Sequence, residues 1–139
     1  MSDLRNPHAP FGLPPSLEHI SELARRALAT IPPDLARHVT EVGVVVEERA
    51  DEDTLRDLNI DSSWELSGLY RGTPLPERGV LDPVRYPDMI FLYRESILLE
   101  WIETGVDLGD LVRNVVIHEV AHHFGFSDAD IARLETDPD

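Results

Sequence analysis

One stretch near the end of the sequence constrains the fold more than any other. Its apolar residues recur at helical spacing, and Asp107 or Asp110 can cap a helix that runs to Phe124, where Gly125 follows. The apolar positions are Leu111, Val112, Val115 and Val116. Glycine favours the left-handed conformation that ends helices, so the pattern predicts an amphipathic helix that stops at Gly125. The rest of the chain has to be organised around this helix.

The helix carries the motif His-Glu-x-x-His at residues 118–122. Because an α-helix completes a turn in about 3.6 residues, His118 and His122 lie one above the other, and Glu119 is rotated from His118 by about 100°. Neutral imidazoles leave a bound zinc ion its full positive charge, which lowers the pKa of its water to about 7. The spacing therefore predicts zinc on His118 and His122, with Glu119 as the catalytic general base.

A third metal ligand has to come from the residues after the motif. Gly125 can turn the chain back, and Asp128 lies six residues beyond the second histidine, where a carboxylate can return to the metal. A competing interpretation places Asp128 in the first turn of a last helix, capped by Ser127, where the helix dipole favours an acid. Both interpretations can hold together. Glu135 and Asp130 are the alternative ligands.

Other polar residues have weaker claims to a chemical role. His123 points to a different helical face, so we expect it to pack inside the protein or to support a ligand rather than to bind the metal. An oxyanion donor would have to lie upstream of the motif, and Tyr70, Arg71 and Tyr86 are the candidates. For each of these three, ordinary loop packing or surface exposure is the favoured explanation.

Composition narrows the range of metals and partners. The chain has no cysteine, so any metal has to be held by histidine and carboxylate side chains. Its 27 acidic residues outnumber 12 basic ones, all arginine, and the net charge of −15 argues against a nucleic-acid partner. The N-terminus lacks a signal-peptide pattern, and no apolar run is long enough to span a membrane. We therefore expect a cytoplasmic protein without a membrane partner.

The length of 139 residues suits one domain with a single core. Residues 1–15 carry four prolines and are expected to form an irregular N-terminal arm, so that residues 16–139 make up the domain. A helix is predicted to begin after Ser16, its N-cap, and to end at Ile31, where two prolines follow.

The middle of the chain is predicted to form strands and loops. Residues 42–46 and 89–93 are apolar and rich in strand-forming side chains, which predicts two strands. Residues 59–88 contain many glycines and prolines and are expected to form a loop or a short hairpin. The pattern at residues 97–102 fits either a helix or a turn followed by a strand.

The motif and its surroundings resemble a known family. The pattern His118-Glu119-x-x-His122-x-x-Gly125-x-x-Asp128 is similar to that of the minimal zincin-like metallopeptidases, bacterial proteins predicted to be zinc proteases with a pared-down metzincin-like fold. The similarity extends upstream to Ile31-Pro32-Pro33, Val45-Val46-Glu47, Gly68-Leu69-Tyr70-Arg71-Gly72 and residues 87–94. It implies a small single-domain α+β fold, with a short mixed β-sheet packed on an N-terminal helix and a C-terminal active-site helix. It also implies one zinc ion on His118, His122 and Asp128, with Glu119 as the base.

The favoured function is a zinc metalloendopeptidase that hydrolyses a peptide or protein substrate through Glu-activated, zinc-bound water. By analogy with zincins, an extended substrate would pair with an edge strand, for which residues 89–93 are the candidate. No methionine follows the motif and no second subdomain is expected to wall the cleft, so a deep specificity pocket is not expected. The alternative is a metal-bearing interaction module with little or no turnover. A metal-dependent ribonuclease conflicts with the negative charge.

Overall fold

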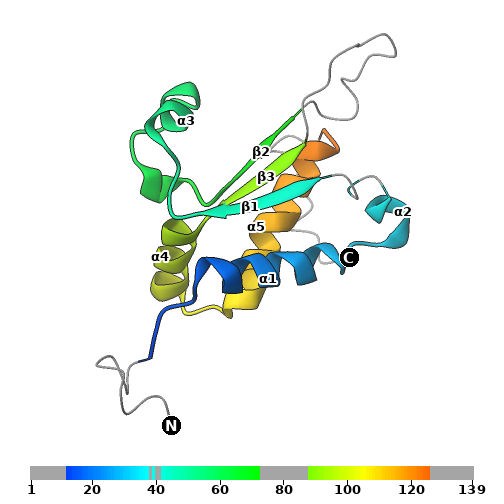
Figure 1. Cartoon of the computed structure of the whole chain (residues 1–139), viewed down its shortest axis with the longest axis horizontal. Helices are drawn as coiled ribbons and strands as arrows, with labels where there is room; N and C mark the ends of the chain where they lie inside the picture. Colours follow the sequence, from blue (N-terminus) through cyan, green and yellow to red (C-terminus); the bar gives the residue numbers. More distant parts are fainter. Residues whose placement is uncertain (1–11, 38, 40–41, 73–87, 126–139) are drawn as a thin grey trace.

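Helices and short strands follow one another along the chain (Figure 1). The computed structural model describes residues 12–37, 39, 42–72 and 88–125. In chain order the elements are α1 (Leu17–Leu28), α2 (Pro33–Ala36), β1 (Gly43–Glu47), α3 (Glu52–Asp57), the 3-10 helix η2 (Ser63–Glu65), β2 (Gly68–Arg71), β3 (Met89–Tyr93), α4 (Arg94–Thr104) and α5 (Leu108–His123). Together with the mixed sheet, they confirm the predicted α+β class.

The described strands form one sheet in the order β1-β3-β2. β1 runs parallel to β3, with Val44 opposite Ile90, and β2 runs antiparallel to β3, with Tyr70 opposite Ile90. The prediction that residues 89–93 form an edge strand is therefore wrong, because β3 has a neighbour on each side. Apolar residues on both faces of β3 suit a central strand. The stretch that glycines and prolines had marked as a loop contributes β2, an outer strand of this sheet.

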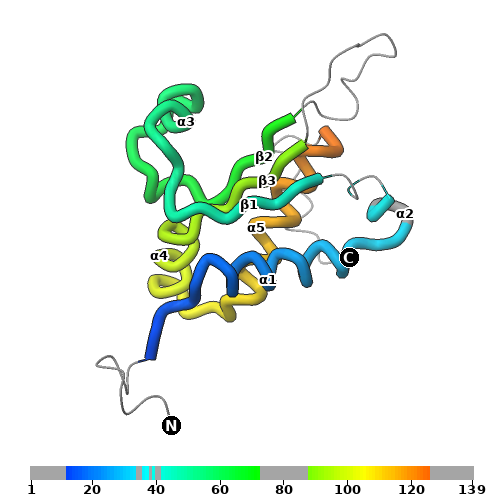
Figure 2. The backbone as a smooth tube through the Cα atoms, in the orientation of Figure 1, coloured from blue at the N-terminus to red at the C-terminus, as the bar shows by residue number. Residues whose placement is uncertain are grey.

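Helix α1 crosses α5 and contacts it, and both helices pack against the sheet (Figure 2). Ser16 caps α1 as predicted, because its side chain accepts a hydrogen bond from the His19 N–H at 3.0 Å. Burial of apolar side chains between the helices and the sheet is the main stabilising contribution to such a layer. The most deeply buried members of this core are Ile20, Ala24, Ile90, Leu92, Ile97, Val112 and Val116.

Residues 97–102, for which the sequence allowed either a helix or a turn followed by a strand, belong to helix α4. The segment is helical, and Ile97 on its inner face is completely buried in the core. Gly105 ends the helix in the left-handed conformation at φ 70°, which glycine adopts without a steric penalty. The chain then turns directly into α5, so that α4 and α5 are in contact.

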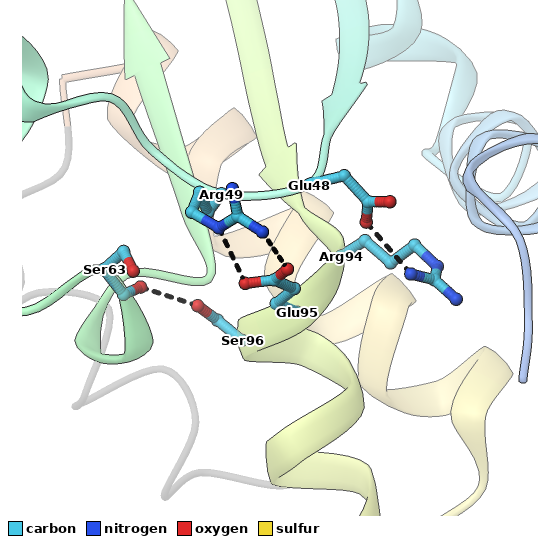
Figure 3. A network of polar contacts seen from close by, with 6 residues as sticks. All are labelled: Glu48, Arg49, Ser63, Arg94, Glu95 and Ser96. Atoms are coloured by element: carbon cyan, nitrogen blue, oxygen red, sulfur yellow. Dashed lines mark hydrogen bonds and ion pairs between the residues drawn. The ribbon is translucent and has the colours of Figure 1, made fainter.

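Polar contacts tie the start of α4 to the segments around it (Figure 3). The Ser96 hydroxyl, which is buried, donates to the Ser63 carbonyl at 2.7 Å and so joins α4 to η2. Two ion pairs link α4 to the chain that follows β1, namely Arg49 with Glu95 and Arg94 with Glu48. Because the ion pairs are partly exposed, each contributes little, whereas the buried Ser96 contact fixes the segment that leads into β2.

Some sequence predictions concern residues that the structure does not describe. These are most of the N-terminal arm, the last helix after Ser127, and Tyr86. Within the described ranges, no helix is both long and apolar enough to cross a membrane.

Candidate functional site

Helix α5 positions the motif, and its ends follow from local chemistry. Of the two candidate caps, Asp107 is the one used, because its carboxylate accepts a hydrogen bond from the Asp110 N–H at 3.0 Å. Gly125 follows the helix with φ 85°, in the left-handed conformation expected of a helix stop. The sequence prediction of this helix is therefore confirmed at both ends.

The three motif side chains lie together on α5. One ligand atom from each of His118, Glu119 and His122 lies within 4.8 Å of the other two. The two imidazole rings have their centroids 5.0 Å apart. Both histidines are half-buried, whereas Glu119 is only 6% exposed. Imidazole nitrogens with a carboxylate nearby make up a donor set that suits zinc, so the residues present fit the metal that the motif implies.

Glu119 is a carboxylate held away from water. Burial raises its pKa, and the opposing contributions come from His122 and His118 and from hydrogen bonds. A hydrogen bond joins the Nδ1 of His122 to the Oε1 of Glu119 at 3.2 Å, and the backbone N–H of Tyr70 also lowers the pKa of Glu119. A carboxylate whose pKa is raised toward neutrality is better matched to accepting and returning a proton.

The edge of β2 faces this carboxylate. In an antiparallel pair, residues alternate between those that hydrogen-bond across the ladder and those whose backbone groups point outward. The Tyr93 N–H donates to the Ser67 carbonyl at 2.9 Å, so Ser67 and every second residue after it hydrogen-bond to β3. The register then places the backbone groups of Gly68 and Tyr70 on the side away from β3. This agrees with the effect of the Tyr70 N–H, which lowers the pKa of Glu119.

Gly68 allows β2 to approach α5 closely. A Cβ atom at this position would lie 2.6 Å from Val115 Cγ1 and 3.4 Å from Glu119 Cγ. The first separation is far below the usual carbon–carbon contact of about 3.5–4.0 Å, so no side chain fits there. The glycines and prolines of residues 59–88 predicted a loop or a short hairpin here, although a glycine in a strand can also signal a close backbone approach.

A pocket of about 340 Å³ lies beside the motif. Its lining includes His118, Glu119, Gly68, Glu65, Glu100 and Asn114. This pocket is open to solvent rather than enclosed, so it does not contradict the expectation that the site lacks a deep specificity pocket. Besides α5, the described residues that line the pocket come from η2, α4 and the chain from Leu66 to Gly68, and no local sequence pattern indicates that these segments meet.

The remaining sequence candidates fall into two groups. His123 is 1% exposed and packs inside the protein, as predicted. Tyr70 uses its hydroxyl internally, donating to Asp88, and Arg71 is exposed with its Nη2 3.4 Å from Thr54 Oγ1, so neither contact favours an oxyanion role. Tyr86 lies outside the described residues, as do Asp128 and the alternative ligands Asp130 and Glu135.

The fold and the site together define a class of protein, in which a helix carrying His-Glu-x-x-His packs beneath an outer strand of a small mixed sheet. A helix with this motif is the signature of zincins. The family model for zincin-like metallopeptidases matches residues 39–137, more than two thirds of the chain, and the protein therefore belongs to the zincin-like metallopeptidase family. The matched segment includes position 128. No curated protein matches the chain.

Proposed function

We propose that this protein is a zinc-dependent endopeptidase. The observation that carries the proposal is the grouping of His118, Glu119 and His122 around one point beside a pocket and an outer strand. His118, His122 and Asp128 would hold the metal. Zinc, when bound, polarises a peptide carbonyl and makes water acidic enough to lose a proton near neutral pH.

Glu119 carries the proton in this scheme. Its carboxylate accepts a proton from the attacking water as the new carbon–oxygen bond forms, and returns that proton to the amine nitrogen as the carbon–nitrogen bond breaks. Both steps need a base that is neither fully solvated nor permanently ionised. Its burial and raised pKa support this role.

The outer edge of β2 offers a place for the substrate backbone. The carbonyl and N–H of Gly68 point away from β3, as do those of Tyr70, whose N–H also lowers the pKa of Glu119. An extended peptide adds to such an edge through backbone hydrogen bonds, which sets its orientation without selecting its sequence. This proposal moves the substrate strand from residues 89–93 to β2.

The pocket beside the motif would select a substrate side chain. Glu65 and Glu100 contribute exposed carboxylates to its lining. The whole chain also carries a net charge of −15, which attracts cations at long range. We therefore propose that peptides with an arginine or lysine beside the cleaved bond are preferred.

A peptide-cleavage assay on the zinc-loaded protein tests the function. Glu119→Gln keeps the shape of the side chain but removes the base, so cleavage of a mixed peptide library should fall about 10²–10⁴-fold. Glu103→Gln, at an exposed position on α4, is the matched control and should cleave like the wild type. If zinc binds and no peptide is cleaved by the wild type, the protein is an interaction module rather than an enzyme.

A further inference from the structure

A second polar cluster lies inside the protein next to the metal motif. Tyr70 is on β2, Asp88 directly precedes β3, and His123 is the last residue of α5. The Tyr70 hydroxyl donates to Asp88 Oδ1 at 2.8 Å, and its oxygen lies 3.2 Å from His123 Nδ1. We call these three residues the Tyr70 cluster. The cluster joins β2, the start of β3 and the end of α5 at one point.

The surroundings of the Tyr70 cluster make it rigid. Asp88 is 8% exposed and His123 only 1%, so breaking their contacts would leave polar atoms buried without partners, which is costly. Gly72 has φ +151°, and a Cβ there would overlap the Asp88 carboxylate and lie 2.8 Å from the Tyr70 hydroxyl. A glycine at this position therefore makes room for the hydrogen bond between Tyr70 and Asp88.

Tyr70 connects this cluster to Glu119 through its own backbone. Its side chain is fixed by Asp88 and His123, while the sheet register points its N–H outward from β3. This N–H lowers the pKa of Glu119, as a donor facing the carboxylate does. One residue thus makes both contacts. Any movement of the phenol out of its place between β3 and α5 would shift the N–H that contacts Glu119.

We infer that Tyr70, Asp88 and His123 are positioning residues that hold the edge strand so that the Tyr70 N–H orients Glu119. As far as it concerns catalysis, this role rests on the proposed peptidase function. The position of the Tyr70 N–H beside Glu119 can be measured whether or not the protein is a peptidase. A base displaced by about 1 Å loses on the order of 10²-fold in rate, so the cluster should affect kcat more than KM.

Amide hydrogen exchange of the zinc-loaded protein measures the positioning directly. In Tyr70→Phe the exchange of the residue-70 N–H should become at least about tenfold faster, as expected for a lost hydrogen bond. The N–H groups of residues 69 and 71 point toward β3 and should keep their protection. Thr30→Ala removes the hydroxyl that donates to the Ala27 carbonyl at the end of α1 and should leave exchange at Tyr70 unchanged.

Substitutions at Asp88 provide a second test that does not depend on Tyr70→Phe. Asp88→Asn keeps an oxygen that can accept the Tyr70 hydroxyl proton and should retain slow exchange at residue 70, whereas Asp88→Ala should not. With a cleaved peptide, Asp88→Ala should lower kcat about 10²-fold with KM nearly unchanged, and Asp88→Asn should recover most of the loss.

The two proposals fail in different ways. Faster exchange at residue 70 in the absence of any peptidase activity supports the positioning role and rejects the proposed function. Cleavage that requires Glu119 but is insensitive to Tyr70→Phe, with unchanged exchange at residue 70, overturns the positioning role alone. Equal effects of Asp88→Asn and Asp88→Ala would also overturn it.

Discussion

Substituting Gly68 with alanine tests how closely β2 approaches α5. Gly68 lies in an extended strand, where alanine adopts the backbone conformation without strain. In open space such a change would stabilise the protein by about 0.4–1 kcal/mol, because alanine has less freedom in the unfolded chain. Here the new Cβ would lie 2.6 Å from Val115 Cγ1, and an overpacked contact of this kind costs about 1–3 kcal/mol. The steric term is the larger, so Gly68→Ala should lower the free energy of unfolding by about 1–2 kcal/mol.

The steric explanation also predicts a rescue. Val115→Ala removes the methyl group that the new Cβ would meet, at a cost of about 1 kcal/mol for a half-buried side chain. The double variant should then be about 1–2 kcal/mol more stable than the sum of the two single effects implies, since contacting residues couple. Urea unfolding of all four proteins gives each free energy, and thermal unfolding should shift by roughly 3–5 °C per kcal/mol.

Two results would refute this reasoning. If Gly68→Ala is as stable as the wild type, β2 and α5 are not in close contact at this point. If the effects of the two substitutions simply add, the cost of the alanine comes from somewhere other than Val115. Either result would also remove the basis for placing the substrate strand over the motif.

Three further predictions concern the metal and the pocket. Zinc at 100 times its Kd should stabilise the protein by about 2.7 kcal/mol, and removal by a chelator should reverse the shift in Tm. His122→Ala and Asp128→Asn should each weaken zinc binding more than about 100-fold, beyond the loss usual for outer-shell partners, as measured by titration calorimetry. Joint substitution of Glu65 and Glu100 by glutamine should lower kcat/KM for arginine-containing peptides roughly two- to fivefold relative to neutral ones, and an unchanged ratio would reject the pocket preference.

Much of the candidate site could be predicted because its information is local. A spacing of four residues on one helix is enough to bring His118 and His122 together, and Asp107 and Gly125 end that helix through their own backbone and side-chain chemistry. Ser16 does the same for α1. These predictions depend only on residues within a few positions of one another.

The sheet order could not be predicted in this way. β1 and β2 pair with the same strand from opposite sides, and their pairing residues lie far from it in the sequence. The apolar composition of β3 showed that it was buried but did not show where it lay among its neighbours. The glycines at positions 68 and 72 suggested a loop, whereas their actual use is a close approach between a strand and the side chains around it.

The sequence by itself determined the helix, its two ends and the grouping of His118, Glu119 and His122, because helical periodicity is a property of consecutive residues. Only the tertiary structure decided that β2 is the strand beside Glu119, that η2 and α4 wall a pocket, and that Tyr70 joins the base to Asp88 and His123. Those contacts join segments brought together by burial of a shared core. The free energy of burial depends on the apolar area removed from water and on close packing, and it does not specify which strands become neighbours.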